Sequence, residues 1–369
     1  MISLLANFGV SPFDTDWLTS ALVLTTPILL AAIGELVSER AGVLNVGLEG
    51  MMLSGAFFSY YVAWESGSLA VGVFAGIAAG IMFGVVMGLL SIEAGADQIV
   101  SGVGINLAAI GLTSYLFDQI FGNLAQIVLP TVGVVRIPGL ADIPSIGPAL
   151  FDQDVVLYLA FLLVPAAWFL LYRTKWGLAV RAAGELPAAA DTAGISVRRV
   201  RWAGVLVASG LAGLAGAHLA IVQVGIFHQE MTAGRGFLAL VAVIFGRWRP
   251  LGVLGACFAL GGTDALQLRL ADRSEVPRAL WGALVAVAVA FMLYKALVSR
   301  GRARGTTLVA ACLVAGAAIG LLVSTPHVFL PIQLWRSLPY LLALVVLAGG
   351  VTRARMPSKL TLPYYRGES

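Results

Sequence analysis

The sequence predicts an all-α fold, a polytopic transmembrane bundle of about 10–11 helical spans with a short helix on the cytoplasmic side. Composition supports this in two ways. The 369 residues are 59% hydrophobic and only 11% charged, whereas a soluble domain carries about 25% charged residues. The 43 glycines suit a bundle in lipid, because small residues let helix backbones approach closely. We therefore expect residues 1–369 to form a single transmembrane domain.

About eleven apolar runs are long enough to cross about 30 Å of hydrocarbon. The second and the seventh contain glycines and polar residues, so we expect broken helices there. In chain order the runs are Trp17–Val37, Ala41–Trp64, Leu69–Ile92, Gln98–Phe117, Val155–Tyr172, Trp202–Val224, Phe227–Phe245, Leu251–Leu270, Ala279–Val298, Thr306–Ser324 and Ile332–Val351.

The basic residues predict the orientation of the chain. When residues 173–201 are placed in the cytoplasm, about 17 of the 23 Lys and Arg residues fall on the cytoplasmic side and about five outside. Cytoplasmic loops carry an excess of basic residues, so we expect an external N-terminus and a cytoplasmic C-terminus. The same bias explains the net charge of +4 without a nucleic-acid partner. We expect a multi-pass membrane protein.

The segment 173–201 is one of the few charged islands in the chain. Six basic residues frame the shorter stretch Gly184–Gly194. Pro187 suits the first turn of a helix and Gly194 suits its end, because proline lacks the N–H that a first turn leaves unused and glycine tolerates a left-handed stop. We expect a short capped helix held rigidly outside the bilayer, where a soluble partner could push or pull on it.

A long connection on the external side spans residues 118–154. It carries four prolines, at positions 130, 138, 144 and 148, and one basic residue, Arg136. Long loops in compact proteins are usually functional or disordered. Two roles fit this composition, a stiff loop that receives a protein from outside and a plain connector.

Polar residues inside the membrane are candidates for function, because polar groups are costly there. The first group is Glu35, Asn45 and Glu49 in GELVSERAGVLNVGLEG. Asn45 and Glu49 are four residues apart and share a face wherever the segment is helical. Broken helices with polar faces form transporter sites at the membrane midplane. A hydrogen-bonded packing element without substrate contact fits the same residues.

A second group follows at the next span. Asp97 and Gln98 are expected to cap its helix at the cytoplasmic edge. Asn106 lies two to three turns deeper and could face a substrate, because its amide both donates and accepts hydrogen bonds.

A third group lies further along the chain, at Gln223, Glu230, Arg235, Asp264 and Gln267. Arg235 and Asp264 fall in neighbouring apolar runs and are a candidate intramembrane ion pair. Phe57 belongs to an aromatic cluster that could stack on a planar ligand or form an interfacial belt. The candidate substrate pathway therefore comprises Asn45, Glu49, Phe57, Asn106, Gln223, Asp264 and Gln267.

Several chemical motifs are missing from the sequence. It contains no GxxxxGK[ST] phosphate loop, no HExxH and no CxxC. Cys257 and Cys312 lie inside apolar runs and are expected to be small core residues. We expect no metal site and no cofactor bound by this chain, which makes a membrane-embedded enzyme the weakest functional class.

Five stretches, in order along the chain, resemble the permease subunits of ATP-binding-cassette importers for nucleosides, within the wider ribose/branched-chain amino acid permease group. The first is the opening signature GELVSERAGVLNVGLEGMML. The five are Gly34–Leu53, Ala96–Phe117, Arg173–Val197, Met231–Gly252, and Leu338–Ala348 with the tail Met356–Glu368.

The resemblance implies a non-catalytic subunit of a bacterial or archaeal inner or plasma membrane. This subunit would pair with a second permease, either a related chain or a second copy. It implies two ATPase subunits, which hold ATP and Mg, and an external substrate-binding lipoprotein or periplasmic protein. The segment 184–194 resembles the family's coupling helix, which sits in a cleft of the ATPase. The coupling positions that it implies are Gly184, Glu185, Pro187, Ala188, Ala189, Asp191 and Gly194.

The chain departs from the family pattern after Asp264. About 55 to 65 residues separate the segment that begins there from the one at Leu338, and they contain two apolar runs. We expect an added transmembrane hairpin over residues 277–330, peripheral to the transport core.

The sequence leaves three alternatives to an ATP-driven nucleoside importer, two that differ in the substrate and one that differs in the mechanism. Related permeases carry simple sugars, and nucleobases would suit the same kind of site. An ion-coupled secondary transporter would instead use buried acids such as Glu49 or Asp264 as ion carriers.

Overall fold

The computed structural model describes residues 15–122, 127–144, 146–271, 337–350 and 356–364. Within these ranges the chain is helical apart from short connections and two strands of two residues each. Six of the described helices are long and apolar enough to cross a membrane, which confirms an all-α, multi-pass membrane protein. The hairpin expected at 277–330 lies outside the described residues, as does Cys312.

The elements follow the expected spans closely, and two spans end in π-helical turns, η1 and η2. In order they are α2 (Thr15–Arg40), α3 (Leu48–Ser66), α4 (Leu69–Gly88), η1 (Leu89–Glu93), α5 (Gln98–Phe121), β1 (Val135–Arg136), α6 (Gly147–Phe151), β2 (Asp152–Gln153), α7 (Val155–Arg173), α8 (Lys175–Glu185), α9 (Pro187–Thr192), α10 (Val197–Ala217), η2 (His218–Val224), α11 (Arg235–Phe245), α12 (Pro250–Ala271) and α16 (Leu338–Gly350).

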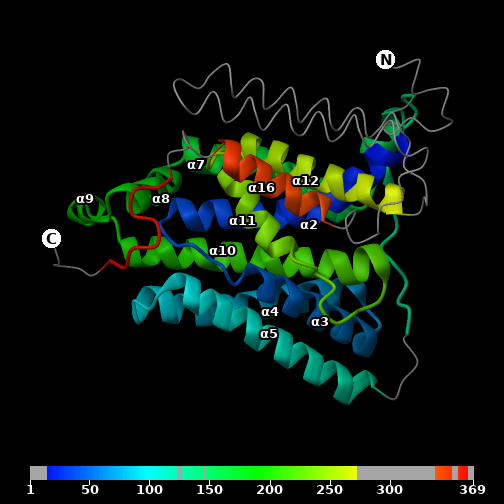
Figure 1. Cartoon of the computed structure of the whole chain (residues 1–369), viewed down its shortest axis with the longest axis horizontal. Coiled ribbons are helices and arrows are strands. Elements are labelled where there is room, and N and C mark those ends of the chain that lie inside the picture. The colour runs from blue at the N-terminus through cyan, green and yellow to red at the C-terminus, as the bar shows by residue number, and fades with distance from the viewer. Residues whose placement is uncertain (1–14, 123–126, 145, 272–336, 351–355, 365–369) are drawn as a thin grey trace, which may run out of the picture. The chain divides into compact units, whose positions relative to one another are not determined.

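Helices α2 and α10 form the centre of the compact unit that contains residues 15–263 and the described residues from 339 onward. They pack against each other, and α10 also packs against α3 and α4 (Figure 1). About 83% of the apolar stretch of α2 and 78% of that of α10 is buried, against 33% for α4 and α5 and 28% for α7. The outer helices therefore present apolar side chains outward, as a bilayer requires.

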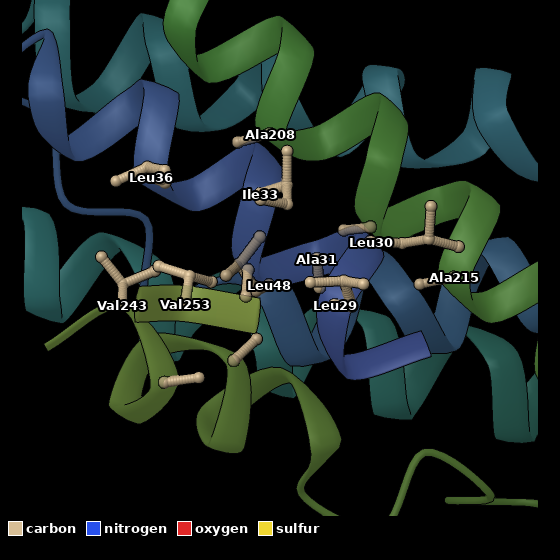
Figure 2. Close-up of a cluster of buried hydrophobic side chains, with 14 of the residues drawn as sticks. Leu29, Leu30, Ala31, Ile33, Leu36, Leu48, Ala208, Ala215, Val243 and Val253 are labelled. Atoms are coloured by element: carbon tan, nitrogen blue, oxygen red, sulfur yellow. The ribbon is translucent and has the colours of Figure 1, made fainter. Parts of the chain in front are cut away.

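The largest hydrophobic cluster joins helices that are distant in the sequence. Figure 2 shows Leu29 and Leu30 of α2 beside Ala215 of α10, with Val243 of α11 and Val253 of α12 near Leu48 at the start of α3. All of these side chains are buried. Small residues of α10 let the larger leucines of α2 fill the space between the two backbones.

Gly216 of α10 is one position where this packing depends on the absence of a side chain. A Cβ atom added there would collide with the carbonyl oxygen of Met52 and would lie 2.6 Å from the backbone nitrogen of Ala56, both in α3. Because the obstacle is backbone, no rotamer change could relieve the collision. Helices α10 and α3 can therefore approach this closely only with glycine at 216.

The two spans expected to contain broken helices each begin with a non-helical stretch and then hold one continuous helix. After α2 ends at Arg40, residues 41–47 are not helical, and α3 begins at Leu48. In the seventh run the helix begins only at Arg235, because residues 225–234 form turns that include left-handed backbone at Gly225 and Gly234. The run Phe227–Phe245 therefore contains a helix of 11 residues, which is shorter than the sequence predicted.

The described parts of the connection 118–154 are folded and anchored to the bundle. Strands β1 and β2 pair antiparallel, with Val135 opposite Gln153. The hydroxyl of Tyr60 on α3 donates to the carbonyl of Ile127 at 2.6 Å, and the N–H of Leu129 donates to the carbonyl of Gly225 at 2.8 Å. These contacts fix the path of the connection on the helices beneath it.

Candidate functional site

The segment proposed as a coupling element consists of two helices joined at a sharp bend. Helix α8 ends at Glu185, Leu186 has φ −143° and ψ 79°, and α9 begins with Pro187 in its first turn. Gly194 follows with φ +83°, a left-handed conformation that favours glycine. The predicted proline start and glycine stop are confirmed. Gly184 and Glu185, however, end the preceding helix and do not belong to α9.

Backbone contacts hold the bend against the rest of the unit. A Cβ at Gly184 would collide with the carbonyl oxygen of Arg40 at the end of α2, so α8 and α2 touch directly. From the other side, Lys359 N–H donates to the Gly184 carbonyl at 3.0 Å. The carboxylate of Glu185 accepts from the N–H of Ser358 at 3.2 Å and from its hydroxyl at 2.8 Å.

The C-terminal segment 356–364 thus packs beside the segment 184–194 (Figure 1). Sequence reasoning did not find this contact, since about 170 residues separate the two segments. The only signal in the sequence was the tail's own resemblance to the family pattern.

Helix α9 presents a small, smooth surface. Ala188 and Ala189 are exposed, Asp191 is half-buried, and Pro187 and Ala190 point inward. Leu186, at the bend, is 60% exposed although it is a large apolar residue. An exposed leucine beside two alanines can enter a concave surface of another protein without leaving large gaps.

The break between α2 and α3 is held by side chains that the sequence marked as polar. The Asn106 amide oxygen accepts from the N–H of Gly50 at 2.8 Å, and its NH₂ group donates to the Val46 carbonyl at 3.0 Å. Gln98 accepts from the N–H of Leu44 at 2.8 Å. The amides of α5 therefore satisfy backbone groups that the break leaves without helical partners.

The capping role expected at the start of α5 belongs to Asp97 alone. Its Oδ1 accepts from the N–H groups of Ile99 and Val100, both at 2.9 Å, as the sequence predicted. Gln98 was expected to share this role, but its amide reaches across to the α2–α3 break.

Asn45 lies inside the break and is fully buried. Its Oδ1 accepts from the N–H of Gly47 at 3.2 Å, and its NH₂ group lies 3.3 Å from the sulfur of Met51. Its backbone N–H donates to Glu35 at 2.8 Å. Asn45 and Asn106 therefore meet around the same seven-residue break, each engaged with the protein itself.

Glu49 forms the densest set of contacts among the candidates. Its Oε1 accepts from the hydroxyl of Thr232 at 2.6 Å and the N–H of Gly234 at 2.7 Å, and its Oε2 accepts from the N–H of Gly236 at 2.6 Å. A carboxylate in this position caps α11 and complements the positive end of its dipole. The charge on Glu49 is thus compensated by the first turn of another helix.

Two further carboxylates lie one turn apart on α2. Glu35 and Glu39 are both buried, and Oε2 of Glu39 accepts from the indole N–H of Trp248 at 2.5 Å. Arg40 donates to the carbonyl of the same tryptophan at 2.6 Å. Sequence reasoning singled out Glu35 but passed over Glu39, although their i, i+4 spacing within an apolar helix was a usable signal.

Phe57 and Gln223, two of the remaining pathway candidates, contact other parts of the chain than the α2–α3 break. Phe57 is buried in an aromatic cluster, with its ring centroid 5.3 Å from that of Phe227. Gln223 donates to the carbonyl of Val23 at 2.9 Å. Asp264 and Gln267 lie one turn apart on α12, and the pairing of Arg235 with Asp264 stays a prediction.

One polar contact was not foreseen at all. Nε2 of His218, at the start of η2, lies 3.3 Å from Oδ2 of Asp154, and both residues are buried. Asp154 also caps α7 by accepting from the N–H of Leu157 at 2.9 Å. Nothing in the sequence connects His218 to an acid 64 positions away.

Comparisons with known proteins agree with this architecture. The family described as "branched-chain amino acid transport system / permease component" matches residues 17–293. NupQ of Bacillus subtilis, a guanosine ABC transporter permease, is 37% identical over 257 residues, 68% of this chain and 81% of NupQ. NupC of Lactococcus lactis, a nucleoside ABC transporter permease, is 38% identical over 248 residues, 65% of this chain and 78% of NupC.

A third relative carries a different solute name. TsgC13 of Haloferax volcanii, provisionally named a glucose ABC transporter permease, is 40% identical over 261 residues, 70% of this chain and 78% of TsgC13. A second guanosine transporter permease of B. subtilis, NupP, is 24% identical over 278 residues, 72% of this chain and 78% of NupP. No solved structure matches the chain. With a match that covers most of the chain and relatives at this level of identity, the chain belongs to the branched-chain amino acid transport system / permease component family.

Proposed function

We propose that this chain is the permease subunit of an ATP-binding-cassette importer that carries nucleosides. The observation that carries the proposal is the similarity to NupQ and NupC, which are named for the transport of guanosine and of nucleosides. The segment 184–194 supports the ATP-driven part, because it offers a rigid projection with an exposed, nearly smooth face. The chain itself is a non-catalytic membrane component, with ATP and Mg held by separate ATPase subunits.

The second candidate solute is a simple sugar, since TsgC13 is provisionally named for glucose. Nucleobases are a third. The solute is best identified on the cognate external binding protein, purified with whatever it holds and analysed by mass spectrometry. Uptake of labelled guanosine, uridine, adenine and glucose into proteoliposomes then shows which class of solute, nucleoside, nucleobase or sugar, is carried best. Saturable uptake of glucose without uptake of any nucleoside would overturn the nucleoside proposal.

We infer a transporter of two permeases, two ATPases and an external binding protein. The match to both NupP and NupQ, two permeases of guanosine transporters in one organism, favours a related but different partner chain over a second copy. In this assembly the segment 184–194 and the C-terminus face the cytoplasm and the N-terminus faces outward, as the distribution of basic residues predicts.

The proposed coupling route runs from α9 to the centre of the bundle. Closure of the ATPase dimer would move α9, and the close contact of Gly184 with Arg40 passes this movement to α2. Because α2 is the most buried span, its displacement would shift the helices packed around it. A rigid contact suits this task, since a compliant one would absorb the movement.

The proposed substrate path runs between the two permeases. Asn45, Glu49 and Asn106 are proposed to support it indirectly, since their polar atoms hold the α2–α3 break and the start of α11. Phe57, Gln223, Asp264 and Gln267 stay candidates for weak contacts with the solute. Weak contacts are suitable for an importer, because tight binding of the solute would slow its release into the cell.

The experiment for the coupling role uses the double variant Glu185→Ala/Gly194→Ala. The first change removes the carboxylate that binds Ser358, and the second places a side chain at φ +83°, which costs roughly 1–2 kcal/mol. Transport and substrate-stimulated ATPase activity of the reconstituted complex should fall together while membrane insertion persists. Lys175→Gln, on exposed α8 surface, is the matched control. Unchanged stimulation of the ATPase activity by substrate in the double variant would contradict the coupling role of the segment 184–194.

A simpler measurement distinguishes ATP-driven import from the rival mechanism, ion-coupled secondary transport. Vesicles that contain ATP but no proton or sodium gradient should accumulate solute. Uptake that requires an ion gradient and ignores ATP would favour the rival.

A further inference from the structure

The corner between α11 and α12 has an unusual backbone. Arg247 and Trp248 are consecutive residues, and both have φ of +53°, a left-handed conformation that residues with bulky side chains rarely adopt. Such a backbone persists only where the surrounding structure holds it in place, and it occurs preferentially at functional and moving elements. The contacts that hold this corner come from the end of α2.

The last turn of α2 binds Trp248 in two ways. Arg40 donates to the Trp248 carbonyl through Nε at 3.1 Å and through Nη2 at 2.6 Å. Oε2 of Glu39 accepts from the indole N–H at 2.5 Å, and this second contact is buried. A buried hydrogen bond does not compete with water. The end of α2 therefore fixes both the backbone and the ring of Trp248. We call these three residues, 39, 40 and 248, the Trp248 clamp.

Arg40 also contacts the segment 184–194. Its own carbonyl oxygen is the atom with which a Cβ at Gly184 would collide. The backbone of Arg40 thus lies against the end of α8, while its side chain is bonded to the corner between α11 and α12. A single residue therefore joins the proposed coupling segment to this corner.

The corner itself is closely packed. A Cβ at Gly246 would collide with the backbone nitrogen of Val253, and a Cβ at Gly252 would collide with the carbonyl oxygen of Gly246. The N–H of Trp248 donates to the carbonyl of Val243 at 3.1 Å, which ties the corner to the last turns of α11. Because these contacts are between backbone atoms, a displacement of Trp248 displaces the end of α11 with it.

The other end of α11 is bound to α3. Glu49 accepts from the N–H groups of Gly234 and Gly236 there, at 2.7 and 2.6 Å. With 11 residues, α11 is about 16 Å long, and Figure 2 shows its Val243 near Leu48 at the start of α3. The helix thus connects the end of α2 with the start of α3, which are the two sides of the break at 41–47.

We propose that the Trp248 clamp is a positioning element that passes movement of the segment 184–194 to α11, and through Glu49 to the break between α2 and α3. The inference rests on the coupling role proposed for that segment, and it adds a defined route to the displacement of α2. A short helix bound at both ends moves as one unit. The break, where Asn45 and Asn106 are engaged, would therefore change its geometry when the ATPases close.

The test compares variants of the assembled transporter, reconstituted with its ATPases and its external binding protein. Position between two sites does not by itself demonstrate coupling, so the quantity measured is the amount of labelled guanosine imported per ATP hydrolysed. Labelled glucose replaces guanosine if the wild type imports that sugar instead. Arg40→Met removes both donors at similar length, and the ratio should fall roughly fivefold or more. Arg40→Lys keeps the charge and a donor and should restore part of the ratio.

Two matched controls remove comparable contacts outside the clamp. Arg198→Met removes a guanidinium contact of 2.7 Å to Glu93 and should keep the wild-type ratio. If Arg40→Met does not fold, Trp248→Phe takes its place, because it leaves Arg40 unchanged and removes only the indole N–H; its ratio should also fall. Trp202→Phe is the control for that change, since the Trp202 indole donates to Glu93 at 2.6 Å.

A second readout does not depend on the solute. Binding of a non-hydrolysable ATP analogue to the assembled transporter should change the hydrogen–deuterium exchange of residues 235–245. In Arg40→Met, and in Trp248→Phe, this response should be smaller than in the wild type. Loss of packing alone would raise exchange with and without the nucleotide and would leave the response to the nucleotide in place.

The outcomes separate this inference from the proposed function. A clamp that only stabilises the fold would lower the melting temperature but leave the uptake per ATP of the folded transporter unchanged, and that result would overturn the inference alone. An equal fall of the ratio in Trp202→Phe or Arg198→Met would overturn it as well. A wild-type complex that hydrolyses ATP but imports neither guanosine nor glucose would overturn the proposed function, and the inference with it.

Discussion

The carboxylate of Glu49 on α3 caps α11 by accepting the N–H of Gly236 at 2.6 Å. The cap acts between two helices separated by nearly 190 positions in the chain. It places the start of α11 against the start of α3, and both of these helix starts follow a broken span. Glu49 thus ties the two breaks together, which explains how two irregular segments can remain stable in a membrane protein.

Replacement of this carboxylate should lower stability. Glu49→Gln keeps the shape of the side chain but removes the charge and turns one acceptor oxygen into a donor, so at least one donor among Thr232, Gly234 and Gly236 is left unsatisfied. We expect a loss of roughly 1–3 kcal/mol, seen as a lower melting temperature of the purified protein in detergent. A Glu49→Gln protein that melts like the wild type but no longer transports would instead indicate a direct role in the substrate pathway.

Glycine 216 should be intolerant of any side chain. Gly216→Ala places a methyl group against the Met52 carbonyl of α3, so we expect a large drop in melting temperature or in folded yield. Gly104→Ala is the matched control, because the space around that helical position of α5 is open to 4 Å among the described residues. Helix propensity alone predicts that the control is neutral or gains up to about 1 kcal/mol. Equal effects at both positions would contradict the packing argument.

The contact between Asp154 and His218 predicts a pH dependence of stability. Burial by itself raises the pKa of the Asp154 carboxyl, but the hydrogen bond to His218, its charge and the N–H groups of Val156 and Leu157 outweigh it and lower the pKa. A carboxyl with a lowered pKa in the folded state stabilises the protein above its unfolded pKa, about 3.9, and this contribution disappears as the pH falls through the folded value.

Asp154→Asn should therefore cost roughly 1 kcal/mol at neutral pH, and the difference from the wild type should narrow as the pH falls below about 4. Melting temperatures over a pH series measure this. Asp97→Asn, which changes the carboxylate that caps α5, controls for the loss of a capping charge. A constant difference at every pH would show that the charge of Asp154 is not the stabilising feature.

The bond between Glu185 and Ser358 should hold the tail in place. Ser358→Ala removes the 2.8 Å hydroxyl contact and should weaken tail docking by roughly 0.5–1.5 kcal/mol. Faster hydrogen exchange at residues 356–364, with unchanged exchange in α10, is the expected result. Ser66→Ala serves as a control, since that hydroxyl donates to the Val62 carbonyl and accepts from the N–H of Ser68, both within four residues of it in the chain. Unaltered exchange in Ser358→Ala would mean that two other contacts are enough to hold the tail. These are the bond from the Lys359 N–H to the Gly184 carbonyl and the bond from Arg201 to the Leu362 carbonyl.

The sequence was informative wherever a signal is local. Apolar run length located the described spans, glycines and polar residues marked both breaks, and Pro187 with Gly194 delimited α9. The errors arose where partners are remote. Gln98 appeared to be a cap because its distant acceptor role toward Leu44 leaves no trace in spacing. Asp154 with His218, and Glu185 with Ser358, are pairs that only the folded chain brings together.

The candidate pathway illustrates the same limit. Polar residue type singled out Asn45, Glu49 and Asn106, and all three bond to backbone groups of the protein itself. Residue type alone could not tell a ligand contact from such a backbone partner. That distinction depends on the broken backbone at 41–47, whose carbonyl and N–H groups need partners in the absence of water. The non-helical backbone therefore forms hydrogen bonds with the same kinds of side chain, amides and carboxylates, that would bind a polar solute.

The contact of Lys359 with Gly184 also has a consequence for biosynthesis. A ribosome completes α8 and α9 long before it reaches residues 356–364, so the Gly184 carbonyl and the Glu185 carboxylate gain their partners only near the end of translation. Until then, the surface proposed to meet the ATPase lacks one of its supports. A nascent or prematurely terminated chain would therefore enter the membrane with the segment 184–194 still lacking its contacts to residues 358 and 359.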